Sequence, residues 1–116
     1  MAVATVNGSI GGDLGTHPKA RVWLLEDRTL VLCVPDKTAP GRVRRQRYDG
    51  AVRAARWQNR SKLLTVELTG DSSPTVTVNA KGCGCGMGAA GNAGPEPGAY
   101  DVVRVRQPEW YSTDQT

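Results

Sequence analysis

The sequence predicts an all-β protein, a small antiparallel barrel or sandwich of five to six strands. Short apolar runs rich in β-branched residues alternate with polar turns, the clearest segment has a two-residue hydrophobic period, and no stretch shows convincing helical periodicity. The 116 residues allow one domain with one modest core, because Phe is absent and 14 Gly and 7 Pro interrupt the chain.

Residues 1–20 are expected to form an extended N-terminal arm. Four glycines interrupt this stretch, and its few apolar residues are too scattered to give one amphipathic face. Such a segment is either disordered or a strap that becomes ordered along a neighbouring subunit. The β domain is then expected to span residues 21–107.

Two hairpins are predicted in this domain. The first joins residues 21–25 to residues 29–34, and Pro35 ends its second strand because proline cannot donate to a β ladder. Cys33, within that strand, is interpreted as a small buried hydrophobe. The second hairpin is the clearest element: residues 62–80 alternate apolar and polar side chains on both sides of a Gly-Asp-Ser turn, which predicts an antiparallel pair with one buried face.

The remaining segments are less regular. Residues 36–49 are expected to be loop and residues 51–57 a short strand. Residues 81–98 contain seven glycines and no periodicity. They are expected to form a long Gly-rich loop, and a loop of that length in a compact domain is usually functional or disordered. Residues 100–105 supply a last strand, followed by a C-terminal tail at residues 108–116.

Arginine is concentrated in one stretch of this basic chain, whose formal net charge is +4. Between residues 42 and 62, Asp49 is the only acid. A guanidinium binds carboxylates and phosphates in a bidentate manner and stacks on aromatic rings such as those of Tyr48 and Trp57. The stretch therefore predicts docking onto an acidic protein surface or onto a phosphate backbone; the alternative is a solvated loop and outer strand face. The candidate contact residues are Arg42, Arg44, Arg45, Arg47, Arg53, Arg56 and Arg60.

A Gly-Cys run opens the Gly-rich loop: Gly82, Cys83, Gly84, Cys85 and Gly86. No Gly-Lys-Ser/Thr sequence follows, so the run does not match a phosphate-binding loop. A structural zinc site needs four ligands, and apart from these two cysteines the chain offers only Cys33, in a strand, and His17. No metal or other cofactor is expected unless another subunit completes a site. The favoured interpretation is an interface loop whose small residues pass close to a neighbouring backbone.

The sequence lacks the residue patterns that are typical of a catalytic site. The single histidine, His17, has no evident carboxylate to orient it, no serine has a nucleophile-elbow context, and no paired acids are predicted on adjacent strands. The protein is therefore not expected to be an enzyme.

Two aromatic residues, Trp110 and Tyr111, lie beyond the last predicted strand. Terminal aromatic side chains can anchor a tail in the pocket of a neighbouring subunit. The equally weighted alternative is that they pack back over the open end of the chain's own barrel.

The second hairpin, residues 63–68 and 75–78, runs directly into the Gly-Cys run at residues 82–86. This pattern, about a quarter of the chain, resembles small virion structural proteins of tailed phages that infect actinobacteria. The resemblance implies a head–tail connector of the stopper or adaptor kind, or a capsid-associated (minor capsid or decoration) protein, assembled in many copies. The implied partners are other copies and portal, capsid or tail proteins, with packaged DNA as a further contact and no membrane. The implied location is the virion, after synthesis in the host cytoplasm.

A basic β-barrel that binds nucleic acid is the alternative function, supported by a sequence pI of about 9.3. The chain has no helix-turn-helix, zinc-finger or aromatic-glycine RNA-binding motif. The first residues lack a basic region followed by an apolar run, so no signal peptide is expected, and no apolar stretch approaches the ~20 residues of a membrane span.

Overall fold

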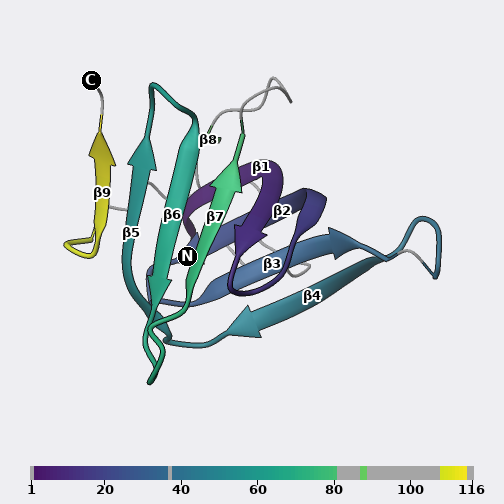
Figure 1. The fold of residues 1–116 in the computed structure, drawn as a ribbon, viewed down its shortest axis with the longest axis horizontal. Helices are drawn as coiled ribbons and strands as arrows, with labels where there is room; N and C mark the ends of the chain where they lie inside the picture. Colours follow the sequence, from purple (N-terminus) through teal and green to yellow (C-terminus); the bar gives the residue numbers. More distant parts are fainter. Residues whose placement is uncertain (1, 37, 81–86, 89–107, 115–116) are drawn as a thin grey trace.

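One open β-sheet runs through the computed structural model, which describes residues 2–36, 38–80, 87–88 and 108–114 (Figure 1). Eight of its nine strands follow the order β4-β3-β2-β1-β7-β6-β5-β9, and β8 pairs with β1 off this path. The neighbours are antiparallel except β5 and β9, which are parallel. The strands are β1 (Ala2–Gly12), β2 (His17–Leu25), β3 (Leu30–Pro35), β4 (Val43–Tyr48), β5 (Val52–Gln58), β6 (Leu63–Leu68), β7 (Thr75–Asn79), β8 (Met87–Gly88) and β9 (Tyr111–Asp114). The described residues form no helix, and hence none long and apolar enough to cross a membrane. The predicted all-β class is confirmed.

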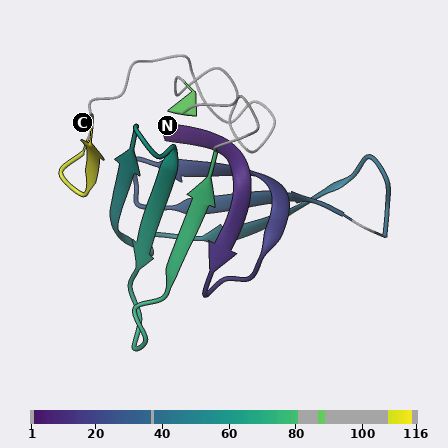
Figure 2. The same ribbon diagram turned by 45° about the horizontal axis from the view of Figure 1, so that its top comes forward.

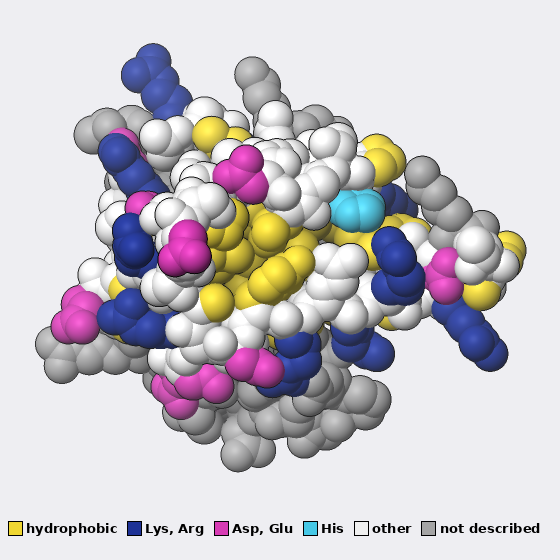
Figure 3. All heavy atoms as spheres, turned by 60° about the horizontal axis from the view of Figure 1, so that its bottom comes forward, with side chains coloured by type: hydrophobic (Ala, Val, Ile, Leu, Met, Phe, Trp, Pro, Cys, Tyr) yellow, Lys and Arg dark blue, Asp and Glu magenta, His cyan; other side chains and the backbone are white. Residues whose placement is uncertain are grey.

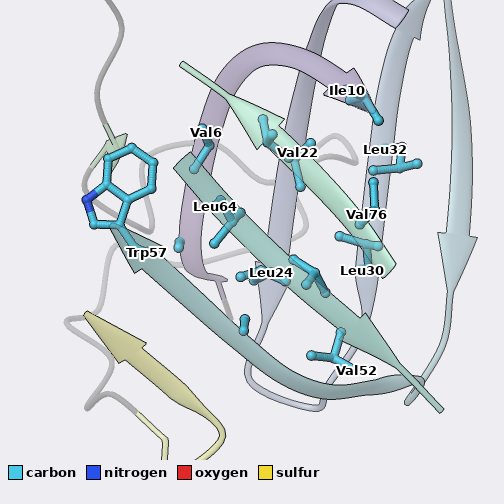
Figure 4. Packing of buried hydrophobic residues seen from close by; sticks show 14 of the residues in the cluster. Val6, Ile10, Val22, Leu24, Leu30, Leu32, Val52, Trp57, Leu64 and Val76 are labelled. Carbon is cyan, nitrogen blue, oxygen red and sulfur yellow. The ribbon is translucent and has the colours of Figure 1, made fainter. Parts of the chain in front are cut away.

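The sheet curls over a single core, so that β2, β3 and β4 lie behind β5, β6 and β7 (Figure 2). β1 bends between these two halves and pairs with both β2 and β7. Figure 4 shows side chains of the two halves meeting in the core, among them Leu24 and Leu30 from one half and Leu64 and Val76 from the other. The ends of the described strand order, β4 and β9, do not pair with each other, so the sheet is not a closed barrel. The finer prediction of a barrel or sandwich is thus not confirmed.

β1 is a central strand of the sheet, so the prediction of an N-terminal arm was wrong. Ala4, Val6, Gly8 and Ile10 are all buried, so burial follows a two-residue period along the strand. A Cβ on Gly8 would collide with the backbone carbonyl of Asn79. Glycine therefore fills an inward-facing position of the strand where no side chain fits, although its presence suggested a break in periodicity.

The two predicted hairpins are confirmed. β2 pairs with β3 and β6 pairs with β7. Along β6 and β7 the alternate apolar side chains are buried, and each contributes about 1.5–3 kcal/mol to stability. β2 and β3 differ, because both of their faces are covered: Leu24 faces the main core, while Trp23, Leu25 and Val31 form a second buried cluster. Cys33 packs against that cluster but is half-buried rather than buried.

β4 replaces most of the loop that was predicted for residues 36–49. It is an edge strand paired with β3, and only residues 36–42 form the connecting loop between the two strands. The strand escaped prediction because an edge strand with arginine on both of its faces has no hydrophobic period. The predicted strand at residues 51–57 is confirmed as β5, in which a β-bulge between Val52 and Ala54 shifts the phase of burial.

The C-terminal tail returns to the sheet. β9 pairs with β5, and Trp110 and Tyr111 join the main core with exposures of 8% and 4%. The alternative in which these aromatic side chains anchor the tail in a neighbour's pocket is therefore wrong for this structure, since their own chain encloses them. Residues 82–86 and the predicted strand at residues 100–105 lie outside the described residues; of the Gly-rich loop, the structure describes β8, which pairs with Thr5 and Val6 of β1.

Candidate interaction surface

The β3–β4 hairpin extends well beyond the rest of the body (Figures 1 and 2). Its strands pair out to Pro35 and Val43, and the Asp36 amide then donates to the Arg42 carbonyl over 2.9 Å. The Asp36 carboxylate accepts hydrogen bonds from the Thr38 hydroxyl at 2.7 Å and amide at 3.0 Å, which lower the pKa of Asp36. These bonds order the loop and fix the direction in which the hairpin projects.

The projecting part carries guanidinium groups around one apolar side chain. Val43 is 51% exposed and is the one exposed large hydrophobic side chain within the described part of the chain. Its neighbours Arg42 and Arg44 are also exposed. Because side chains alternate along a strand, Arg44 lies on the core-facing side with its partner Val34, and Arg45 on the opposite side with Cys33. We call the described residues of this part, 36 and 38–44, the hairpin tip.

The structure brings together only some of the seven predicted arginines. Arg42, Arg44, Arg45 and Arg47 lie on β4 and its loop, whereas Arg53 and Arg56 lie on β5 and Arg60 in the turn after it. Three of the seven pair with nearby carboxylates: Arg47 with Asp49 at 3.2 Å, Arg53 with Glu67 at 3.5 Å, and Arg56 with Asp114 at 2.8 Å. Exposed ion pairs of this kind contribute at most about 1 kcal/mol each to stability. The pairs of Arg53 and Arg56 nevertheless neutralise the charge of β5. The basic surface therefore belongs to the hairpin.

A thiol lies on the outer face at the base of this hairpin. Cys33 stands between Arg21 of β2 and Arg45 of β4 in the strand register. Burial raises the pKa of the Cys33 thiol, and the charges of Arg45 and Arg21 offset only part of the rise. The Arg21 guanidinium lies 5.9 Å from the centre of the Trp23 ring and donates from Nε to Asn7 Oδ1 over 2.9 Å. The thiol is thus kept protonated near neutral pH, the form that does not act as a nucleophile.

A second surface forms where four turns of the sheet meet. Two hydrogen bonds join the β2–β3 turn to the β4–β5 turn: Val52 N donates to Arg28 O (2.9 Å) and Gly50 N to Thr29 Oγ1 (3.3 Å). Thr69 N donates to Ala51 O (2.8 Å) and joins the β6–β7 turn to the β4–β5 turn. Asp13 N donates to Thr75 O (2.8 Å) and joins the β1–β2 turn to the start of β7. Exposed carboxylates decorate this end of the molecule: Asp13, Glu26, Asp27, Asp49 and Asp71. We call these five residues and their turns the acidic turn end.

Apolar side chains also reach the surface at the acidic turn end. Leu14, Tyr48 and Ala51 belong to these turns or adjoin them, and each is half-buried against the core. Figure 3, which brings this end forward, shows an apolar area with both acidic and basic side chains around it. Sequence reasoning missed this surface, because its acids are far apart in the chain and meet only when the turns do.

Arg47 pairs with Asp49 at this end, and a second cation there, Arg28, is also engaged within the molecule. Its Nη1 donates to the carbonyls of Val52 at 3.1 Å and Arg53 at 3.3 Å. Its Nη2 lies 3.7 Å from the Glu109 carboxylate, and its guanidinium lies 5.9 Å from the centre of the Trp110 ring. Arg28 thereby connects the β2–β3 turn to β5 and to the tail.

Of the four residues that were weighed as metal ligands, the structure describes two, and these lie in different strands. Within the ranges that the structure describes, no three His, Cys, Asp or Glu side chains are close enough to hold a metal ion. His17 begins β2 and Cys33 lies in β3, while Cys83 and Cys85 fall outside those ranges.

Comparison with known proteins adds no relative. No family model, curated protein or solved structure matches this chain.

Proposed function

We propose that this protein is a non-enzymatic structural protein that assembles with copies of itself and with other proteins, as a component of a tailed-phage virion. A head–tail connector of the stopper or adaptor kind, or a capsid-associated protein, is the role that fits its parts. The observation that carries the proposal is the β3–β4 hairpin, which projects from the body with arginines around an exposed valine. The resemblance of residues 62–86 to small virion proteins supports the same role.

The hairpin is suited to docking because it is already ordered. Leu30, Leu32 and Val34 anchor its first strand in the core with exposures of 1% or less. A segment ordered before binding loses little conformational freedom when it docks, so more of the contact energy remains as affinity. Arginine is enriched at protein interfaces, where its guanidinium pairs with carboxylates and its stem covers apolar surface.

Nucleic-acid binding is supported less well by the same residues. Non-specific single-strand binding uses aromatic side chains as stacking platforms beside a basic groove. Trp57 is buried in the core, and the Tyr48 side chain packs against this core. In addition, Arg44 and Arg45 lie on opposite faces of β4, and the arginines of β5 are paired with carboxylates. Within the described residues, the basic side chains of the hairpin are thus divided between its two faces.

Sedimentation velocity of the full chain, with negative-stain imaging of the same sample, tests the proposal. We expect concentration-dependent assembly into rings or larger particles, or co-sedimentation with portal or capsid shells. A strict monomer that binds neither itself nor these shells contradicts the proposal. Fluorescence anisotropy with labelled DNA at about 50 mM salt tests the alternative, and binding that weakens steeply with salt would favour that alternative instead.

A further inference from the structure

We infer that the hairpin tip of one copy docks on the acidic turn end of a second copy. The inference rests on the proposed function, because it names the contact through which copies of the chain assemble. The two surfaces are different parts of one molecule, so the contact is head-to-tail. Repetition of such a contact closes into a ring or continues as a filament, depending on the rotation between copies.

Charge complementarity points to this occupant. The hairpin tip presents the guanidiniums of Arg42 and Arg44, and the acidic turn end presents five exposed carboxylates, of which Asp49 is also paired with Arg47 of its own chain at 3.2 Å. Two of these carboxylates are held in place by backbone amides: Asp13 Oδ2 accepts from Thr75 N at 2.9 Å and Asp27 Oδ1 from Thr29 N at 3.1 Å. An ionised carboxylate has about four acceptor sites, so each can also accept from an incoming guanidinium.

Apolar complementarity accompanies the charges. Val43 follows Arg42 and precedes Arg44 in the chain, with half of its surface in solvent, and alternation along β4 places it on the same face as Arg45 and opposite Arg44. At the acidic turn end, Leu14, Tyr48 and Ala51 are half-buried in or beside the turns that carry the acids, and Figure 3 shows an apolar area on this side of the molecule. The hairpin tip therefore has one exposed apolar side chain close to its arginines, and the acidic turn end has apolar side chains close to its carboxylates and to the guanidiniums of Arg28 and Arg47.

The hairpin tip cannot reach the acidic turn end of its own chain. β4 runs from Val43, within the tip, to Tyr48, beside Asp49 of the acidic turn end. Val43 and Asp49 are six residues apart along this extended segment, a distance of about 20 Å. Pairing of β4 with β3 along its whole length keeps that separation. A second copy is the molecule that can bring the two surfaces together.

Charge reversal on each surface provides the test. One variant carries Arg42→Glu and Arg44→Glu. The other carries Glu26→Arg, Asp49→Arg and Asp71→Arg, which turns five carboxylates into two carboxylates and three guanidiniums, a formal change from −5 to +1. Asp13 and Asp27 are kept because their carboxylates hold backbone amides. Lys62→Glu, in the β5–β6 turn and outside the candidate contact residues, is the control for a change of charge elsewhere, and circular dichroism checks the fold of every variant.

Sedimentation velocity at a concentration where the wild type associates gives the readout. We expect each reversed variant alone to sediment as a single chain of 12.4 kDa, and Lys62→Glu to behave as the wild type does. An equimolar mixture should assemble again, because the acidic hairpin of one variant meets the basic turn end of the other, and the unchanged surfaces also match. Association of either folded variant alone at the wild-type level, or a mixture that stays monomeric, overturns this contact while leaving the proposed function intact. A wild type that neither self-associates nor binds shells overturns both.

Discussion

Replacing Gly8 with alanine tests the position of β1 in the sheet. Gly8 pairs with Ala20 of β2 and lies against the end of β7. A Cβ at this position would collide with the carbonyl of Asn79 and lie 3.1 Å from the Cα of Ala80. Both atoms belong to the backbone, so no side-chain rotation can relieve the contact, and two strands must move apart.

We expect Gly8→Ala to lower the free energy of unfolding by about 1–3 kcal/mol, the usual cost of adding a methyl group to a packed site. Alanine also restricts the unfolded chain, which favours folding by about 0.4–1 kcal/mol. If residues 1–20 were an arm without fixed structure in the folded protein, neither effect would operate, and Gly8→Ala would leave the free energy of unfolding unchanged. Each kcal/mol corresponds to a fall in Tm of about 4 °C for a domain of this size.

Gly11→Ala is the matched control, because Gly11 lies in the same strand. A Cβ there would meet only Thr77 Oγ1 at 3.4 Å, an ordinary contact with a side chain that can adjust. This variant should stay within about 0.5 kcal/mol of the wild type. Urea unfolding, followed by fluorescence of the three tryptophans, compares the midpoints. Equal midpoints for Gly8→Ala and Gly11→Ala would refute the placement of Gly8 against β7.

Three further predictions concern the tail. Trp110→Ala should destabilise the chain by about 3–5 kcal/mol in urea unfolding, because the ring is buried in the core; an unchanged midpoint would mean that the tail is not part of the fold. Burial raises the pKa of Tyr111 from 10.0 to about 12, although a hydrogen bond with Thr113 opposes the shift. The unfolded chain ionises first, so the stabilising effect is complete below pH 10 and is lost as the pH rises towards 12, by about 2–3 kcal/mol. Unfolding measured across this range should show a smaller loss for Tyr111→Phe than for the wild type, and equal losses would exclude Tyr111 as the cause. Asp114→Asn should cost less than about 1 kcal/mol, and less still in high salt, because the pair with Arg56 is solvent-exposed; a larger cost that salt does not reduce would contradict this.

The parts of the fold that the sequence predicts are those whose burial follows a local pattern. β6 and β7 alternate strictly because one face is buried and the other is half-exposed. β2 and β3 are detectable as continuous apolar runs, and such runs indicate burial on both faces, which the second cluster around Trp23 fulfils. In each case the environment of a residue can be inferred from its immediate neighbours in the chain.

The parts that the sequence conceals depend on distant contacts. Gly8 interrupts the apolar pattern of β1 because the backbone of Asn79, some 70 residues later, occupies the space of a side chain. β4 has no buried face of its own to mark it and becomes a strand only by pairing with β3. For the candidate surface, arginine content identified the basic stretch, but topology decides that Arg42 and Arg44 project while Arg53 and Arg56 are paired.

Folding and docking use different residues of the hairpin. Val34 is the last buried residue of β3, and its partner Arg44 and everything beyond the pair are exposed or half-buried within the described residues. Substitutions at Arg42 and Arg44 therefore remove no core contact, and surface changes of this kind usually alter stability by less than about 0.5 kcal/mol. Loss of assembly in such a variant would reflect loss of the contact itself. The same separation leaves the tip free to change in sequence with its partner, while the buried side chains of β3 continue to hold it in position.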